Sequence, residues 1–144
     1  MGSKKALFIC KGNWLRSQMA AAIYNKLMGT CDADSVGTYP GAPDEPEGQL
    51  LSDLFEDPYF FEIMEEHGMN VRSCRTKRLL PPMLDEYEIV VSMAEDPYVP
   101  DFLKASEKVI FWQIENPIDG DKKTLEGIYG RIERLVGELI SKSM

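Results

Sequence analysis

The sequence predicts a single-domain α/β protein with a central, mostly parallel four-stranded sheet and helices on both faces. Short apolar runs alternate along the chain with segments of helical periodicity, an order typical of parallel sheets that are covered on both sides. The length of 144 residues suits one domain with a buried core, so residues 1–144 are taken as one unit.

Four runs are rich enough in apolar and β-branched residues to be predicted as strands. They are residues 5–10, 33–38, 87–93 and 108–114. Proline and glycine mark most of the helix limits, since proline suits a first turn and glycine a left-handed stop. The predicted helices are 16–28 before Gly29, Asp57-Pro58 to His67 before Gly68, a short helix from Asp96-Pro97, and 123–140.

The overall composition excludes several classes of partner. The net charge of −8 disfavours binding to nucleic acid or to an anionic membrane. No run is apolar and long enough to span a bilayer. Three widely spaced cysteines fit a reduced, cytoplasmic protein better than a disulfide scaffold. With one histidine and no CxxC pair, we expect no metal site, and we expect no cofactor.

The segment CKGNWLRS, residues 10–17, lies where the first strand meets the first helix. Backbone N–H groups of such a turn, with the positive end of the helix, form a binding site for anions. Gly12 allows the positive φ or the close approach that such a loop needs. The guanidinium of Arg16 can donate two hydrogen bonds to one oxyanion.

The same positive field favours the thiolate form of Cys10, which suggests covalent attack on phosphorus. Ser17 can donate a hydrogen bond to that sulfur, and Asn13 can brace the loop from within. The spacing between Cys10 and Arg16 alone is a weak signal, and the simpler interpretation is a structural cysteine at a strand end. The strand before, the glycine inside and the helix after favour the active-site interpretation.

With these motifs, the chain resembles the low-molecular-weight protein tyrosine phosphatase family, which includes related arsenate reductases. CKGNWLRS is similar to the family's opening motif C-x-G-N-x-C-R-S. Further similarities follow in the family's order along nearly the whole chain: SVGT at 35–38, the Asp-Pro helix at 57–68, YEIVVSMAED at 87–96 and IENP at 114–117.

The resemblance implies a phosphatase that acts through a phosphocysteine intermediate at Cys10, on a phosphorylated protein or a small aryl phosphate. Phosphate or another oxyanion would be held by Arg16 and by the loop. The residues of that loop are Lys11, Gly12, Asn13, Trp14, Leu15 and Arg16.

Two departures from the family pattern bear on activity. Leu15 replaces the second cysteine of the loop, so oxidised Cys10 would lack that neighbouring partner. Asn116 falls where the family has its general-acid aspartate, and an amide cannot donate the proton that a tyrosine leaving group needs. Asp119, the adjacent Glu115 or water are the candidates to replace it, with reduced activity as the expected consequence.

Several other residues have two interpretations each. Trp14 either forms a wall of the substrate pocket or packs outward. Tyr39 lies in the loop where the family carries aromatic residues of the substrate wall. Lys11 either raises the local positive potential or is simply solvated. His67 fits a structural role at a helix end. The basic stretch 72–78 contacts an acidic partner or is a solvated connector.

The sequence therefore leaves three functional hypotheses. The first is a phosphatase with weakened activity. The second, motivated by Asn116, is a nearly inactive relative that binds phosphotyrosine or another oxyanion. The third is arsenate reduction through a thiol relay from Cys10 to Cys74 or Cys31.

Overall fold

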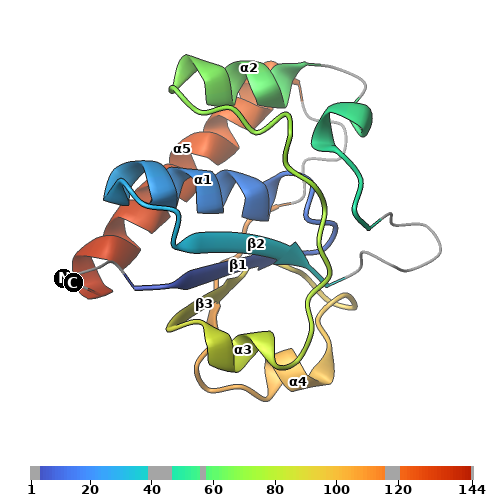
Figure 1. Cartoon of the computed structure of the whole chain (residues 1–144), viewed down its shortest axis with the longest axis vertical. Coiled ribbons are helices and arrows are strands. Elements are labelled where there is room, and N and C mark those ends of the chain that lie inside the picture. Colours follow the sequence, from blue (N-terminus) through green and yellow to red (C-terminus); the bar gives the residue numbers. More distant parts are fainter. Residues whose placement is uncertain (1–3, 39–46, 56–57, 116–120, 144) are drawn as a thin grey trace.

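The computed structural model describes residues 4–38, 47–55, 58–115 and 121–143. At its centre is a four-stranded sheet in the order β2-β1-β3-β4, in which every pair of neighbours is parallel (Figure 1). The strands are β1 (Ala6–Cys10), β2 (Ala33–Gly37), β3 (Ile89–Ser92) and β4 (Ile110–Phe111). The predicted parallel sheet with four strands is confirmed.

Strand β1 lies in the middle of the sheet and is buried along its whole length. Its last residues are in register with the ends of both neighbours, because Cys10 pairs with Gly37 and Ile9 pairs with Ser92. The segments that follow β1 and β3 therefore emerge side by side at the carboxyl edge of the sheet, where open α/β sheets bind ligands.

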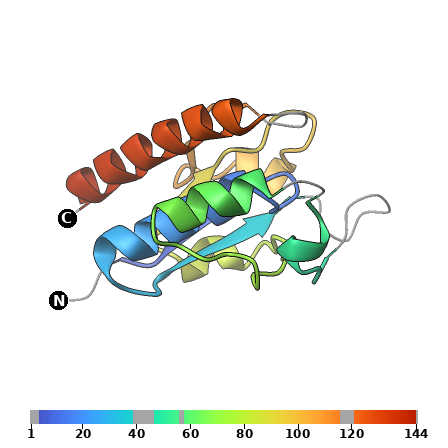
Figure 2. The same ribbon diagram turned by 90° about the horizontal axis from the view of Figure 1, so that it is seen from above.

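Three helices cover one face of the sheet: α1 (Arg16–Met28), α2 (Tyr59–Glu66) and α5 (Lys122–Ser143). In Figure 2, α1 and α2 lie on the same side of α5, and both of these helices contact α5. The buried residues of α5 recur every three or four positions, as expected for an amphipathic helix. Gly29 ends α1 with a left-handed φ of 67°, as the sequence predicted.

The opposite face is covered by two short helices, α3 (Met83–Glu86) and α4 (Asp101–Lys104). The buried apolar residues form two clusters, one on each face of the sheet. Because side chains alternate along β1, Phe8 and Cys10 belong to the cluster under α1, α2 and α5, while Leu7 and Ile9 belong to the cluster on the side of α3 and α4. The prediction of helices on both faces is confirmed. In the described ranges, no helix has both the length and the apolar character needed to cross a membrane.

Two local predictions were wrong or incomplete. The strand expected over 108–114 is only Ile110–Phe111, because β4 is an edge strand that pairs with just two residues of β3. No helix begins at Asp96-Pro97; there the chain makes a turn in which Tyr98 N–H donates to the carbonyl of Glu95 (2.8 Å). The helix begins after Pro100 instead.

Two short helices were not predicted, α3 and the 3-10 helix η1 (Leu51–Asp53). Each is too short to show helical periodicity in the sequence. The proposed cap Asp57 lies outside the described residues, and α2 begins after Pro58.

Candidate active site

The loop between β1 and α1 presents backbone donors at the carboxyl edge of the sheet. Within the described part of the chain, the amides of Gly12, Asn13, Trp14 and Leu15 donate to no protein acceptor. Leu15 precedes α1 without a side-chain cap, so the helix start also keeps its N–H groups open. The sequence suggests Gly12 for the positive φ or the close approach that such a loop needs. In the structure the residue with a positive φ is the next one, Asn13 (φ 61°). These features suit an anion.

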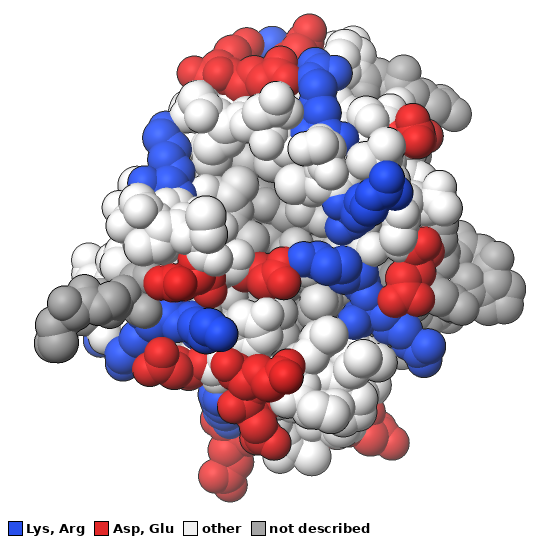
Figure 3. Space-filling view, in the orientation of Figure 1, with Lys and Arg blue, Asp and Glu red and all other residues white. Residues whose placement is uncertain are grey.

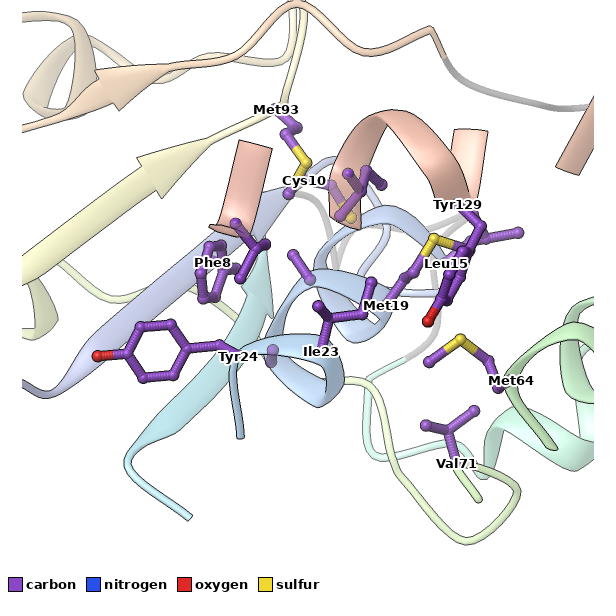
Figure 4. Close-up of a cluster of buried hydrophobic side chains, with 14 of the residues drawn as sticks. Phe8, Cys10, Leu15, Met19, Ile23, Tyr24, Met64, Val71, Met93 and Tyr129 are labelled. Carbon is purple, nitrogen blue, oxygen red and sulfur yellow. The ribbon is translucent and has the colours of Figure 1, made fainter. Parts of the chain in front are cut away.

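Cys10 and Ser17 are in direct contact within this site. Cys10 is buried at the end of β1, where Figure 4 shows it at one end of a cluster with Phe8 and Met19. Its Sγ lies 3.0 Å from Ser17 Oγ, and Asn13 Nδ2 donates to the same Ser17 oxygen at 2.7 Å. Because Ser17 Oγ already accepts from Asn13, its own hydrogen is available to point at the sulfur.

Asn13 is itself fixed by groups outside the loop. Its Oδ1 accepts from the backbone N–H of Lys77 at 2.9 Å. The buried Gln18 amide donates to both Asn13 O and Asn13 Oδ1 and to Arg75 O, each at 3.2 Å. The left-handed turn at Asn13 is therefore held by Lys77 and by Gln18. With Asn13 fixed, its Nδ2 donates to Ser17 Oγ, whose own hydrogen can then point toward Cys10.

Arg16 approaches the site from the start of α1 and is 3% exposed. Its Nη1 donates to the carbonyls of Met93 (2.7 Å) and Ile114 (2.9 Å), which follow β3 and β4. The Glu95 carboxylate lies 2.7 Å from the same nitrogen and 3.4 Å from Nη2. Three acceptors thus converge on one edge of the guanidinium.

The remaining edge of Arg16 keeps its hydrogen-bonding capacity. A guanidinium carries five N–H donors, and in the described structure the Nε–H of Arg16 has no acceptor. Nη2 makes only the long bond to Glu95. The Nε/Nη2 edge is therefore the one that can donate two parallel bonds to an oxyanion.

A cavity of about 640 Å³ adjoins the loop on its Lys11 side. It is lined by Lys11, Glu95, Tyr98, Gln113, Ile114, Glu115 and Arg131. Lys11 Nζ lies 4.2 Å from the centre of the Tyr98 ring, so this cation is held against the cavity wall rather than fully solvated. The cavity has space for the part of a ligand that extends from the loop.

The basic stretch 72–78 is largely engaged with other parts of the chain. Arg72 pairs with Glu65 at 2.6 Å, Lys77 pairs with Asp34, and Arg75 donates to Gly48 O at 2.7 Å. Figure 3 shows acidic and basic side chains interspersed over this face of the molecule. These contacts favour the interpretation as a connector over a separate docking site.

The other two cysteines are placed differently relative to Cys10. Cys31 precedes β2 and lies near the amino ends of the strands, since Ala33 at the start of β2 pairs with Ala6 at the start of β1. Four residues of β1 separate that end from Cys10, about 13 Å at the usual rise, whereas a disulfide needs Cα atoms within about 7 Å. Cys74 is half-buried, and its burial raises the pKa of its thiol.

Several predicted residues receive a structural place, while others do not. Trp14 is half-buried and packs edge-on against Phe55 (5.9 Å between ring centres). His67 ends α2 and stacks on Tyr129 at 4.1 Å, in agreement with a structural role. Asn116, Asp119 and Tyr39 lie outside the described residues. Among the described residues, no group of three or more His, Cys, Asp or Glu could hold a metal ion.

Sequence reasoning missed two residues of this site, Glu95 and Gln18. The pairing of Glu95 with Arg16 could not be predicted, because it depends on β1 and β3 being neighbours in the sheet. For Gln18, a polar residue in the first turn of a buried helix was the available signal.

Comparison with known proteins identifies the family of the chain. The sequence profile of the family "Low molecular weight phosphotyrosine protein phosphatase" matches residues 5–144. The chain belongs to this family. The predicted membership and the predicted fold are thereby confirmed.

Individual relatives are distant and of two kinds. The glutaredoxin arsenate reductase of Synechocystis sp. is 24% identical over 147 residues, which cover 96% of this chain and 98% of that protein. The low-molecular-weight protein tyrosine phosphatase from T. tengcongensis has a TM-score of 0.75 at 23% identity, covering 97% and 99% of the two chains. Vibrio vulnificus Wzb in complex with benzylphosphonate has a TM-score of 0.79 at 20% identity, covering 98% and 99%.

Proposed function

We propose that the chain hydrolyses phosphomonoesters, as a protein-tyrosine-phosphatase-type enzyme, through a phosphocysteine intermediate at Cys10. The observation that carries the proposal is the buried chain of contacts from Asn13 through Ser17 to Cys10 Sγ, next to open loop amides. A hydroxyl that donates to a sulfur stabilises the thiolate, both as nucleophile and as leaving group. The phosphonate-bound structure of Wzb supports an oxyanion ligand.

In the first step, the thiolate of Cys10 attacks phosphorus in line with the bond to the leaving oxygen. The S–P bond forms as the P–O bond breaks, and the leaving oxygen takes up a proton. In the second step, water attacks phosphorus, the S–P bond breaks, and phosphate and the thiolate are released. The loop amides and the Nε/Nη2 edge of Arg16 stabilise the equatorial oxygens in both steps.

The proton for the leaving group is the step for which this chain departs from its family. With Asn116 at the family's general-acid position, we propose that Asp119 or water supplies the proton. Loss of a positioned acid typically lowers the rate by about 10²–10⁴-fold. Aryl phosphates with acidic phenols, which need little protonation, should therefore be hydrolysed much faster than phosphotyrosine.

The test is a series of aryl phosphates of graded phenol acidity, with Cys10→Ser as the inactive reference. We expect a steep dependence of kcat on phenol acidity, whereas equal rates on all members would show an efficient proton donor. The pH–rate profile of Asp119→Asn then assigns the acid. If the basic limb of the profile disappears in this variant, Asp119 is the donor; if it persists, another titrating group such as Glu115 is, and a wild type without a basic limb points to water.

Arsenate reduction is the second candidate, favoured by the match to the Synechocystis arsenate reductase. The position of Cys31 at the far edge of the sheet and the raised pKa of Cys74 disfavour a relay within one chain. Arsenate-reducing activity that persists in the Cys31→Ser, Cys74→Ser double variant would exclude that relay. Phosphate or vanadate binding without any turnover would instead favour the oxyanion-binding hypothesis.

A further inference from the structure

We infer that the cavity beside the loop is a subsite for a second anionic group of the substrate, and that Arg131 of α5 is the residue that binds this group. The inference rests on the proposed function and deepens it, because it names the class of ester. That class is an aryl phosphate with a carboxylate on or next to its ring. Lys11, which lines the same cavity, adds a second positive charge.

The cavity shares residues with the site that holds the phosphate. Lys11 belongs to the loop, and Ile114, whose carbonyl accepts a hydrogen bond from Arg16 Nη1, also lines the cavity. The cavity volume is about 640 Å³, whereas a cavity of about 150 Å³ holds a benzene ring. A phenyl ring that extends from the bound phosphate therefore leaves room for a further substituent.

The charged residues described around the cavity leave a positive balance. They are two cations, Lys11 and Arg131, and two carboxylates, Glu95 and Glu115. Glu95 contacts Arg16 through both of its oxygens, so its charge is offset by that guanidinium. Lys11 and Arg131 then face the single carboxylate of Glu115. In a chain with a net charge of −8, this local excess of positive charge favours an anionic ligand here over other parts of the surface.

Arg131 is held at the cavity by one hydrogen bond and keeps others to donate. Its Nη2 donates to the carbonyl of Gln113 at 2.9 Å. Its Nη1 lies 3.8 Å from a Glu115 oxygen, beyond the usual length of a hydrogen bond, and the Glu115 side chain is 69% exposed. A ligand carboxylate can therefore bind Nη1 with little loss, because it displaces only a long and solvated ion pair.

Lys11 contributes its charge at a defined place. Its Nζ lies 4.2 Å from the centre of the Tyr98 ring, and Tyr98 lines the cavity as well. The face of this ring attracts the ammonium and keeps it at the cavity wall. We therefore expect Lys11 to act through its charge, while the planar donors of Arg131 also fix the direction of the bound group.

The experiment compares two esters of the same shape, para-(carboxymethyl)phenyl phosphate and its carboxamide. The methylene group separates the substituent from the ring, so the two phenols have similar acidity and the ratio of their kcat/KM values reports the subsite. In the wild type we expect the carboxylate ester to be favoured about fivefold, the size of a partly exposed ion pair. In Arg131→Gln the ratio should fall to about one, because the ion pair is lost.

The matched control is Arg134→Gln. Arg134 is exposed on α5, three residues after Arg131, and does not line the cavity. The substitution removes the same charge from the same helix, and the ratio should stay at the wild-type value. A wild-type ratio of one or less would overturn the inference. An equal fall of the ratio in both variants would also overturn it, since such a fall reflects only the overall charge.

Phosphotyrosine peptides distinguish the two sources of the carboxylate. One peptide carries a glutamate next to the phosphotyrosine, and its partner carries a glutamine there. A preference for the glutamate peptide that Arg131→Gln abolishes supports the subsite and assigns it to peptides. A preference confined to the small esters supports the subsite and assigns it to small molecules. A preference of the wild type for an ester with an aminomethyl group in place of the carboxymethyl group would overturn the inference.

A second variant and a binding measurement keep the test independent of folding and of turnover. If Arg131→Gln lowers the melting temperature, Arg131→Lys keeps the charge and should retain part of the preference; its complete loss in a stably folded Arg131→Lys would contradict an ionic contact. The phosphonates that correspond to the two esters cannot be hydrolysed, and calorimetry measures their binding. Tighter binding of the carboxylate phosphonate upholds the subsite even if no ester is hydrolysed and the proposed function fails, whereas equal binding overturns it.

Discussion

The two halves of the candidate active site are built in different ways. The Cys10 half is a chain of buried hydrogen bonds among Cys10, Asn13 and Ser17, all within eight residues of sequence. The Arg16 half depends on acceptors 77 to 98 positions away, in the segments that follow β3 and β4. One half is therefore encoded in a local motif, while the other exists only once the parallel sheet has formed.

This difference predicts how the two halves respond to substitution. Changes in the local half should act on the sulfur and leave the binding of oxyanions in place. Changes in the distant half should act on oxyanion binding and leave the sulfur in place. The predictions below, from the largest effect to the smallest, test this division.

Arg16→Lys should have the largest effect in the distant half, a fall in kcat/KM on the order of 10³-fold. An ammonium carries the charge but cannot contact Met93, Ile114 and Glu95 while also donating two parallel bonds to an oxyanion. Steady-state kinetics and phosphate binding should fall together. If kcat/KM falls by less than about tenfold, the positive charge alone suffices, and the hydrogen bonds that Arg16 donates from two edges of its guanidinium are unimportant.

Ser17→Ala should lower kcat by about 10–100-fold, because the leaving thiolate loses its hydrogen-bond donor. The second step should be the slower one in this variant, so rapid-mixing experiments should show a burst of released phenol. Phosphate affinity should change little. Ser35→Ala, which removes another buried hydroxyl on β2, is the matched control; a similar loss in that variant would mean that Ser17 acts only through stability.

These contrasts also show what the sequence alone could predict. The strand–loop–helix order and the roles suggested for Cys10, Asn13 and Ser17 follow from neighbouring residues, and the expected contacts are present. The sheet was predictable because strands with helices between them pair in parallel. The order β2-β1-β3-β4, which brings Glu95 to Arg16, was not, since the pattern of apolar runs does not determine which strands are neighbours.

The errors at the margins of the fold have the same origin. Strand β4 is shorter than the apolar run at 108–114 because pairing, and not composition, sets the length of an edge strand. The turn at Asp96-Pro97 carries the residues of a helix start, yet Asp96 pairs with Lys104 instead of capping a helix. In both places, contacts between distant residues override a correct local preference.

Gln18→Ala should have a moderate effect, since Gln18 links the loop to Arg75 from behind and does not reach Cys10 or Arg16. We expect a loss of about 1 kcal/mol in the free energy of unfolding, the usual contribution of a buried hydrogen bond. Urea denaturation measures this loss. The fall in kcat should be less than about tenfold, and a fall as large as that of Ser17→Ala would place Gln18 in the catalytic unit.

The smallest expected effect concerns Cys74. Its burial raises the pKa of the thiol, so the folded state favours the protonated form. The resulting stability is complete below the unfolded-state pKa and is lost as the pH rises through the raised folded-state pKa. At neutral pH, iodoacetamide should label exposed Cys31 well before Cys74, as read by mass spectrometry. Faster labelling of Cys74 would reopen the thiol relay.

The most direct test of the account is the alkylation of Cys10 by iodoacetate at mildly acidic pH, with and without inorganic phosphate. If the loop holds a sulfur anion beneath an oxyanion site, Cys10 is carboxymethylated rapidly, phosphate protects it, and Ser17→Ala slows the reaction. A Cys10 that reacts only under alkaline conditions, at a rate that phosphate does not change, would contradict the account.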